Sequence, residues 1–147
     1  MANVYPTINL PTLVAPRSQR NPKLDKIAPS FNFEFGEFEF TLDGRPKMAT
    51  PQETFEQWCV KVCFTERVTK AAYTYRYGVE LEEIATISDI AVARSQIVKT
   101  ISEAIMAHPI TEWVKNFHIK IKGDCVWVAF DVKGKNFDDA TRIEAIL

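Results

Sequence analysis

Acidic side chains are the residues of this chain that could most readily do chemistry. Hydrolysis of a glycosidic bond needs two carboxyl groups close together, one of which has a raised pKa. Glu66 is the first candidate for the acid, with Glu80 or Glu82 as its partner. Such a pair is easily found by chance, because the sequence holds 19 Asp and Glu residues. It also lacks the GxSxG, GxxxxGK, HExxH and GxGxxG motifs, so a hydrolase is our second interpretation.

Sulfur and imidazole groups raise the question of a metal site. Cys59 and Cys63 lie one turn apart on a predicted helix and could join His108 or His118 around zinc. No CxxC pair or HxxxH spacing supports this, so we predict no metal site and no cofactor. The three cysteines are an odd number, and the first residues show no export signal. We therefore expect reduced thiols in a protein made and kept in a cytoplasm.

Glu66 and Arg67 stand where the first predicted helix ends. An arginine there can bind the last helical carbonyl groups and interact favourably with the helix dipole. The alternative is that the planar guanidinium of Arg67 holds the carboxylate of Glu66, or that of a partner, through two hydrogen bonds. It would then fix how the next segment leaves the helix.

That next segment is rich in tyrosine. Tyr73, Tyr75 and Tyr77 alternate with polar residues, which predicts a strand closed by Gly78. Three such rings are more typical of a core, with their hydroxyl groups at its rim, than of a surface that stacks on sugars. A third interpretation is a free-standing binding module with a small-molecule pocket among Tyr73, Tyr75 and Trp127.

The first predicted helix has a strong start signal. Thr50 and Glu53 have the spacing of a capping box, and Pro51 costs no hydrogen bond at the first helical position. Apolar residues then recur at helical spacing and must be buried on one face. They are Phe55, Trp58, Cys59, Val62 and Cys63.

Alternating patterns predict an antiparallel sheet. Residues 31–42 alternate aromatic and polar side chains, and the phase changes at Gly36. A tight hairpin or a bulge at this glycine would keep both aromatic sets on one core. Two further alternating runs, residues 117–121 and 126–132, are joined by a predicted turn at residues 122–124.

A second, longer helix is predicted between these regions. Ser88 or Asp89 caps it, and His108 with Pro109 ends it. Its apolar stripe is Ile90, Ala93, Ile97, Val98, Ile101 and Ile105. Residues 136–147 fit either a short helix or an edge strand.

Length and composition set the domain organisation. With 147 residues and 46% hydrophobic residues, the chain should form one α+β domain, an antiparallel sheet packed on two main helices. That domain spans residues 31–147. Residues 1–30 hold prolines at 6, 11, 16, 22 and 29 and read as an extended arm. The net charge of -1 and the lack of a long apolar run argue against nucleic-acid and membrane partners.

The succession QWCVKVCFTERVTKAAYTYRYGVELEEI resembles the baseplate wedge proteins of contractile phage tails and phage-tail-like bacteriocins. It is most similar to the branch found in prophages of Gram-positive bacteria. The upstream FGEFEFTLDG, the second helix and the closing pair of strands follow in the same order, so the resemblance covers about residues 30–133. The family has carried a lysozyme-like label, which gives the alternative of a peptidoglycan hydrolase.

The resemblance implies a structural protein without catalytic residues. Its expected place is the baseplate of a virion or phage-tail-like particle, assembled in the bacterial cytoplasm in a ring of six copies. The implied partners are the sheath protein, other wedge subunits, and tail tube or hub proteins. Its mechanism would be addition of a sheath strand to an exposed edge between Val114 and Val132, or at Tyr73. The assigned partner-binding residues are Glu66, Arg67, Tyr73, Tyr75, Arg76 and Tyr77.

Overall fold

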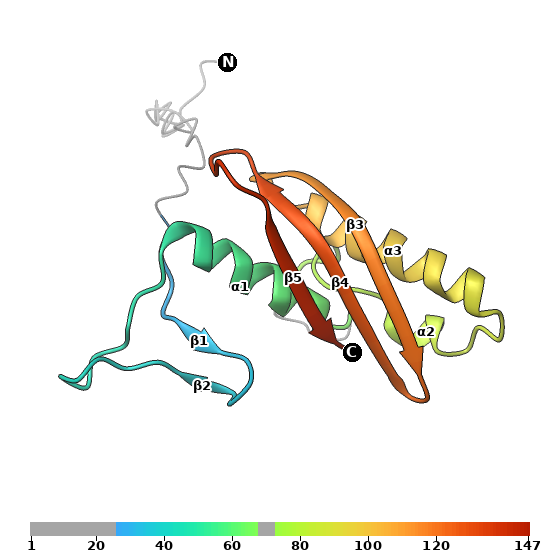
Figure 1. The fold of residues 1–147 in the computed structure, drawn as a ribbon, viewed down its shortest axis with the longest axis horizontal. Coiled ribbons are helices and arrows are strands. Elements are labelled where there is room, and N and C mark those ends of the chain that lie inside the picture. Colours follow the sequence, from blue (N-terminus) through green and yellow to red (C-terminus); the bar gives the residue numbers. More distant parts are fainter. Residues whose placement is uncertain (1–25, 68–72) are drawn as a thin grey trace, which may run out of the picture.

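A computed structural model describes residues 26–67 and 73–147. The predicted α+β fold is confirmed, with an antiparallel sheet and two main helices (Figure 1). Most of the predicted arm lies outside the described residues. The elements in chain order are β1 (Phe31–Asn32), β2 (Glu37–Phe38), α1 (Pro51–Cys63), α2 (Leu81–Ile84), α3 (Ile90–Met106), β3 (Thr111–Lys122), β4 (Cys125–Gly134) and β5 (Thr141–Ile146).

The start of α1 is the predicted capping box. The Thr50 hydroxyl accepts the Glu53 amide at 3.2 Å, and the Glu53 carboxylate accepts the Thr50 amide at 2.7 Å. Two amides that would otherwise lack helical partners are thereby satisfied. The predicted apolar stripe is confirmed, because Phe55, Cys59, Val62 and Cys63 are buried and Trp58 is half-buried.

Asp89 caps the helix α3, and its carboxylate accepts the amide of Ala91 at 2.8 Å. Ile97, Ile101 and Ile105 are buried, as their spacing predicts. Ile90 is the exception in the predicted stripe, since 58% of it is exposed at the first turn. No helix within residues 26–67 and 73–147 is long and apolar enough to cross a bilayer.

The main sheet has the order β3-β4-β5, and all neighbouring strands are antiparallel. The predicted hairpin turn lies between Lys122 and Cys125, which are register partners. β3 is interrupted by a bulge between Lys115 and His118, where Asn116 has φ 57°. The C-terminal segment that the sequence left undecided is the edge strand β5.

The core lies between the sheet and the helices α1 and α3 (Figure 1). Its largest fully buried side chains include Phe130 from β4 and Ile97 from α3. The expectation that residues 31–42 face this core is wrong. β1 and β2 have two residues each and form a small separate sheet, so Phe35 and Phe38 remain 76% and 53% exposed.

Candidate partner-binding site

The end of α1 is tied to the segment that precedes α2. The Arg67 amide donates to the Val79 carbonyl at 2.8 Å, and the Val79 amide donates to the Thr65 carbonyl at 2.9 Å. These bonds form a parallel bridge between Glu66 and Val79, and Val79 is fully buried. Two chain segments separated by the tyrosine-rich stretch therefore meet at one point.

The predicted strand from Tyr73 to Tyr77 is wrong. These residues form bends and a turn, closed by a hydrogen bond from the Tyr77 amide to the Thr74 carbonyl at 2.9 Å. Val79, which follows this turn, makes an isolated bridge, and its partner is Glu66, three residues after α1. Alternation of tyrosines was misleading, because no neighbouring strand is available for the described part of this segment to pair with.

Gly78 makes the close approach of the two segments feasible. It has φ +101°, and a Cβ atom there would lie 2.5 Å from the Thr65 carbonyl oxygen. A left-handed conformation of this kind and such a short contact both require glycine. Gly78 therefore ends the tyrosine segment by letting it fold back against α1.

The Arg67 side chain reinforces the same junction. Its Nε donates to the Gly78 carbonyl at 3.2 Å, and its Nη1 lies 3.0 Å from Glu80 Oε1. The Arg67 side chain is 15% exposed and that of Glu80 is 46% exposed. Arg67 thus holds a carboxylate, but this carboxylate belongs to Glu80 and is contacted through Nη1, whereas the hypothesis named Glu66 or a partner and two hydrogen bonds.

Glu66 caps the short helix α2. Its Oε2 accepts the amide of Leu81, the first residue of α2, at 3.1 Å. The preceding residue, Glu80, makes no side-chain cap, and its own amide donates to Thr100 Oγ1 at 3.1 Å. The neighbouring residues Glu66 and Arg67 thus both bind the segment that leads into α2, Glu66 at Leu81 and Arg67 at Gly78 and Glu80. We call Glu66, Arg67 and Glu80 the clamp.

Next to the clamp lies a group of rings and cations. The rings of Tyr73 and Tyr77 stack with centroids 4.5 Å apart, and Tyr77 meets Trp58 edge-on at 6.0 Å. Burial raises the pKa of Tyr77. Lys61 Nζ lies 5.3 Å from the centre of the Tyr73 ring. Tyr77 is therefore the anchor of the segment, and Tyr73 lies at its exposed rim.

Tyr75 extends outward from this group. It is 69% exposed, and the Arg76 guanidinium lies 5.5 Å from its ring centre. Tyrosine and arginine are among the residue types that are enriched at protein interfaces. We call Lys61, Tyr73, Tyr75 and Arg76 the aromatic–cationic surface. No ring contact among the described residues joins Tyr73 or Tyr75 to Trp127, which instead packs under Lys120 at 4.9 Å.

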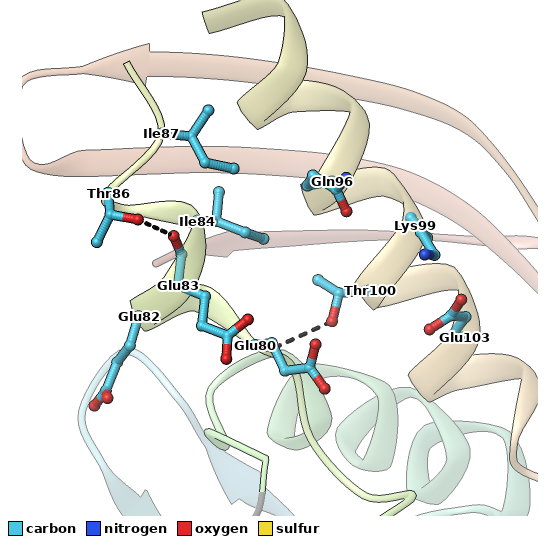
Figure 2. Close-up of a pocket in the computed structure, with 10 residues that line it drawn as sticks. All are labelled: Glu80, Glu82, Glu83, Ile84, Thr86, Ile87, Gln96, Lys99, Thr100 and Glu103. Carbon is cyan, nitrogen blue, oxygen red and sulfur yellow. Dashed lines mark hydrogen bonds between the residues drawn. The ribbon is translucent and has the colours of Figure 1, made fainter. Parts of the chain in front are cut away.

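A groove of about 710 Å³ opens between α2 and α3 (Figure 2). Figure 2 shows the Glu80 and Glu83 carboxylates near its centre, with Glu82 turned away from them. Glu66 is not among its lining residues, and its carboxylate accepts a backbone amide. The predicted catalytic pair therefore does not converge on this groove.

The residues considered as metal ligands do not form a metal site in the described part of the chain either. Within the described ranges, no three His, Cys, Asp or Glu side chains are placed to hold an ion. Burial raises the pKa of Cys63 to about 12 and that of Cys59 well above its ordinary value. His108 packs against the Trp58 ring at 4.3 Å, and its Nδ1 accepts the Ile110 amide at 3.3 Å. These three residues serve as core side chains.

Comparison with known families decides the class of protein. The model of the contractile injection system sheath initiators matches residues 28–136, which include the clamp, both main helices, β3 and β4. The chain belongs to this family. No curated protein matches it at a significant level.

Membership gives this sheath initiator a structural role in starting the sheath of a contractile tail. Such a role implies contacts with sheath and baseplate components of a phage or tailocin particle. The resemblance seen in the sequence is correct at this level. The family match does not extend to the wedge position or to the Gram-positive branch.

Within residues 26–67 and 73–147, the main sheet of the sheath initiator has the edges β3 and β5, because β4 lies between them. The expected edge between Val114 and Val132 is therefore correct for β3 and wrong for β4. Sequence reasoning missed β5 as an edge of the sheet. The signal was present in TRIEAI, where buried Ile143 and Ala145 alternate with exposed residues.

Proposed function

We propose that this sheath initiator starts sheath assembly by accepting a strand from a sheath subunit along β5. An exposed edge offers unpaired backbone donors and acceptors, which give affinity through main-chain hydrogen bonds. The observation that carries the proposal is the regular edge of β5, on whose outer side no strand of the described part of the chain pairs.

The direction of the free backbone groups follows from the strand register. Val126 and Leu147 exchange two hydrogen bonds, of 2.9 and 2.8 Å. In an antiparallel pair such doubly bonded partners alternate with pairs whose backbone groups point away. The amides and carbonyls of Arg142, Glu144 and Ile146 therefore face outward, available to another strand.

β3 is a poorer acceptor than β5. Its bulge and the left-handed Asn116 interrupt the edge, and Lys115, Lys120 and Lys122 lie along the strand. Bulges and lysines are the devices by which proteins protect edge strands from pairing. β5 has an unbroken register and ends in Ile146, which is 64% exposed.

Beyond β5 lies space for an added strand. A groove of about 360 Å³ is bounded by Glu144 of β5, Val60 of α1 and Phe33 from the turn between β1 and β2. Its lining combines apolar side chains with both signs of charge. An incoming strand would thus meet main-chain groups on one side and side-chain contacts on the other.

The finer placement in the particle belongs to the same proposal. We place the protein in the baseplate wedge around the tube, in a ring of six copies, following the resemblance to wedge proteins of Gram-positive prophages. The aromatic–cationic surface would contact neighbouring wedge subunits or tube and hub proteins, with Glu66, Arg67 and Tyr77 holding it in place. Copies in a ring raise the avidity for sheath without new contacts.

We also infer that the chain is a scaffold and performs no catalysis. The binding of Glu66 to the Leu81 amide and of Glu80 to Arg67 supports this. Glu66→Gln tests the hydrolase alternative in a cell-wall clearing assay. Wild-type clearing that the substitution abolishes would establish the hydrolase instead.

Strand addition is tested by a proline in the outward-facing part of β5. Glu144→Pro removes an outward amide that has no partner in β4, whereas Glu144→Thr removes the same carboxylate and keeps the amide. We expect the proline variant to fold and to reduce the fraction of sheathed tubes about tenfold, the effect of about 1.4 kcal/mol. Electron microscopy of particles from complemented cells gives this fraction. Equal sheathing by both variants would refute pairing at β5.

A further inference from the structure

The small sheet of β1 and β2 stands apart from the body of the molecule (Figure 1). No residue from 26 to 48 belongs to the buried core cluster or packs against it. The unit is held together locally, with Phe31 packed edge-on against Phe33 and Phe38 at 5.0 and 5.1 Å. Its exposed side chains therefore do not form part of the core.

This unit exposes several large apolar side chains within ten residues of sequence, which we call the aromatic face. Its members are Phe35, Phe38, Phe40 and Leu42, with exposed fractions of 76%, 53%, 62% and 108%. Because a buried aromatic side chain covers about 150–250 Å², such a set exposes several hundred Å². Apolar surface of that size marks an interaction site.

Two exposed acids of this unit are not paired with a base, although the unit also carries the exposed bases Arg45 and Lys47. Glu34 and Glu37 alternate with the phenylalanines and are exposed. Within the described part of the chain, neither lies within 4.0 Å of a basic group, whereas Glu39 is paired with Lys47 at 2.9 Å. A matching ligand would combine apolar side chains with positive charge.

The first residues of this same chain have that chemistry. Residues 1–25 contain three basic residues, Arg17, Arg20 and Lys23, and one acidic residue, Asp25. They also carry scattered apolar side chains, namely Val4, Tyr5, Ile8, Leu10, Leu13 and Val14. The prolines between them leave little chance of a core of their own.

We propose that residues 1–25 bind the aromatic face of their own chain. They enter the described structure at Lys26, beside the base of the unit where Pro29 bridges to Met48. At about 3.3 Å per extended residue, they can span roughly 80 Å, far more than a short hairpin requires. A tether of this kind gives an effective concentration in the millimolar range, which favours the same chain over a second copy. This inference does not depend on strand addition at β5.

Hydroxyl-radical footprinting tests the proposal, because it measures the solvent exposure of individual phenylalanine side chains. We expect Phe35, Phe38 and Phe40 to be oxidised several-fold more slowly in the full chain than in a chain that begins at Lys26. The core begins at Phe55, so the shorter chain keeps it. Tyr75, which lies outside this face, serves as the control and should react equally in both chains.

Charge exchange in the full chain gives an independent test. Glu34→Lys with Glu37→Lys should abolish the protection, and adding Arg17→Glu with Arg20→Glu should restore it. The matched control is Asp138→Lys with Asp139→Lys, two exposed acids outside the aromatic face.

Two results would overturn the proposal. One is equal oxidation of the aromatic face with and without residues 1–25. The other is protection that rises with protein concentration and that appears on the shortened chain when the full-length chain is added. This result would show that the aromatic face binds a neighbouring molecule.

Discussion

At the scale of single residues, the clamp explains why Glu66 and Arg67 follow α1. Arg67 makes an ion pair with Glu80 at 3.0 Å and donates to the Gly78 carbonyl at 3.2 Å, while 15% of its side chain is exposed. Glu66 accepts the Leu81 amide. The sequence suggested that Arg67 binds a carboxylate, but it could not identify Glu80, because that choice depends on the fold-back at Gly78.

Removing the Arg67 side chain should destabilise the protein. Arg67→Ala takes away two charge-assisted hydrogen bonds, and we expect a loss of about 1–3 kcal/mol in the free energy of unfolding. The control is Arg76→Ala, which removes an exposed cation and should change this free energy by less than about 0.5 kcal/mol. Urea denaturation measures both. Equal effects would mean that the clamp contributes nothing to stability.

His108 should make stability depend on pH. Burial, with a smaller contribution from Lys26, lowers the pKa of His108 below the ordinary 6.5. The unfolded chain therefore binds a proton at this residue before the folded chain does, so stability falls as pH drops below about 6.5. Above that pH the contribution is constant.

His108→Asn provides the comparison, because asparagine can still accept the Ile110 amide but does not titrate. The stability advantage of the wild type over this variant should shrink between pH 7.5 and pH 5. Denaturation curves at several pH values measure it. An advantage that stays constant over this range would show that His108 does not sense pH.

At the scale of elements, the sequence predicted what local chemistry determines. The capping box at Thr50, the stripe of α1 and the turn between β3 and β4 follow from the residues themselves. The conformation of the tyrosine segment does not follow from its own residues, because alternation indicates a strand only where a neighbouring strand can pair with it. β5 was ambiguous for the same reason, since its partner β4 decides its conformation.

Gly78 connects two elements, and a substitution there should strongly destabilise the protein. Gly78→Ala would place a Cβ atom 2.5 Å from the Thr65 carbonyl oxygen in a backbone with φ +101°. We expect a loss on the order of 2–4 kcal/mol in unfolding free energy. Gly123→Ala also adopts a positive φ, +58°, but meets no atom within 4 Å, so its cost should be about 1 kcal/mol. Calorimetry measures the melting temperatures of both variants. Equal melting temperatures would contradict the requirement for glycine at position 78.

At the scale of the whole molecule, the α+β class and the presence of a single core could be predicted from composition and periodicity. The detached aromatic unit could not, because FNFEFGEFEF has the alternation of a half-buried strand and gives no sign that its neighbours are solvent. Likewise, the choice between β3 and β5 needs the sheet order. Both features lie at the surface, where the periodicity of one segment does not show what packs against it.

The most direct measurement of the central claim is a cryo-electron microscopy map of the junction between baseplate and first sheath ring. We predict density for a sheath strand about 4.8 Å from β5, hydrogen-bonded to the backbone of Arg142, Glu144 and Ile146. A map in which sheath is attached while the β5 edge faces solvent would contradict the account.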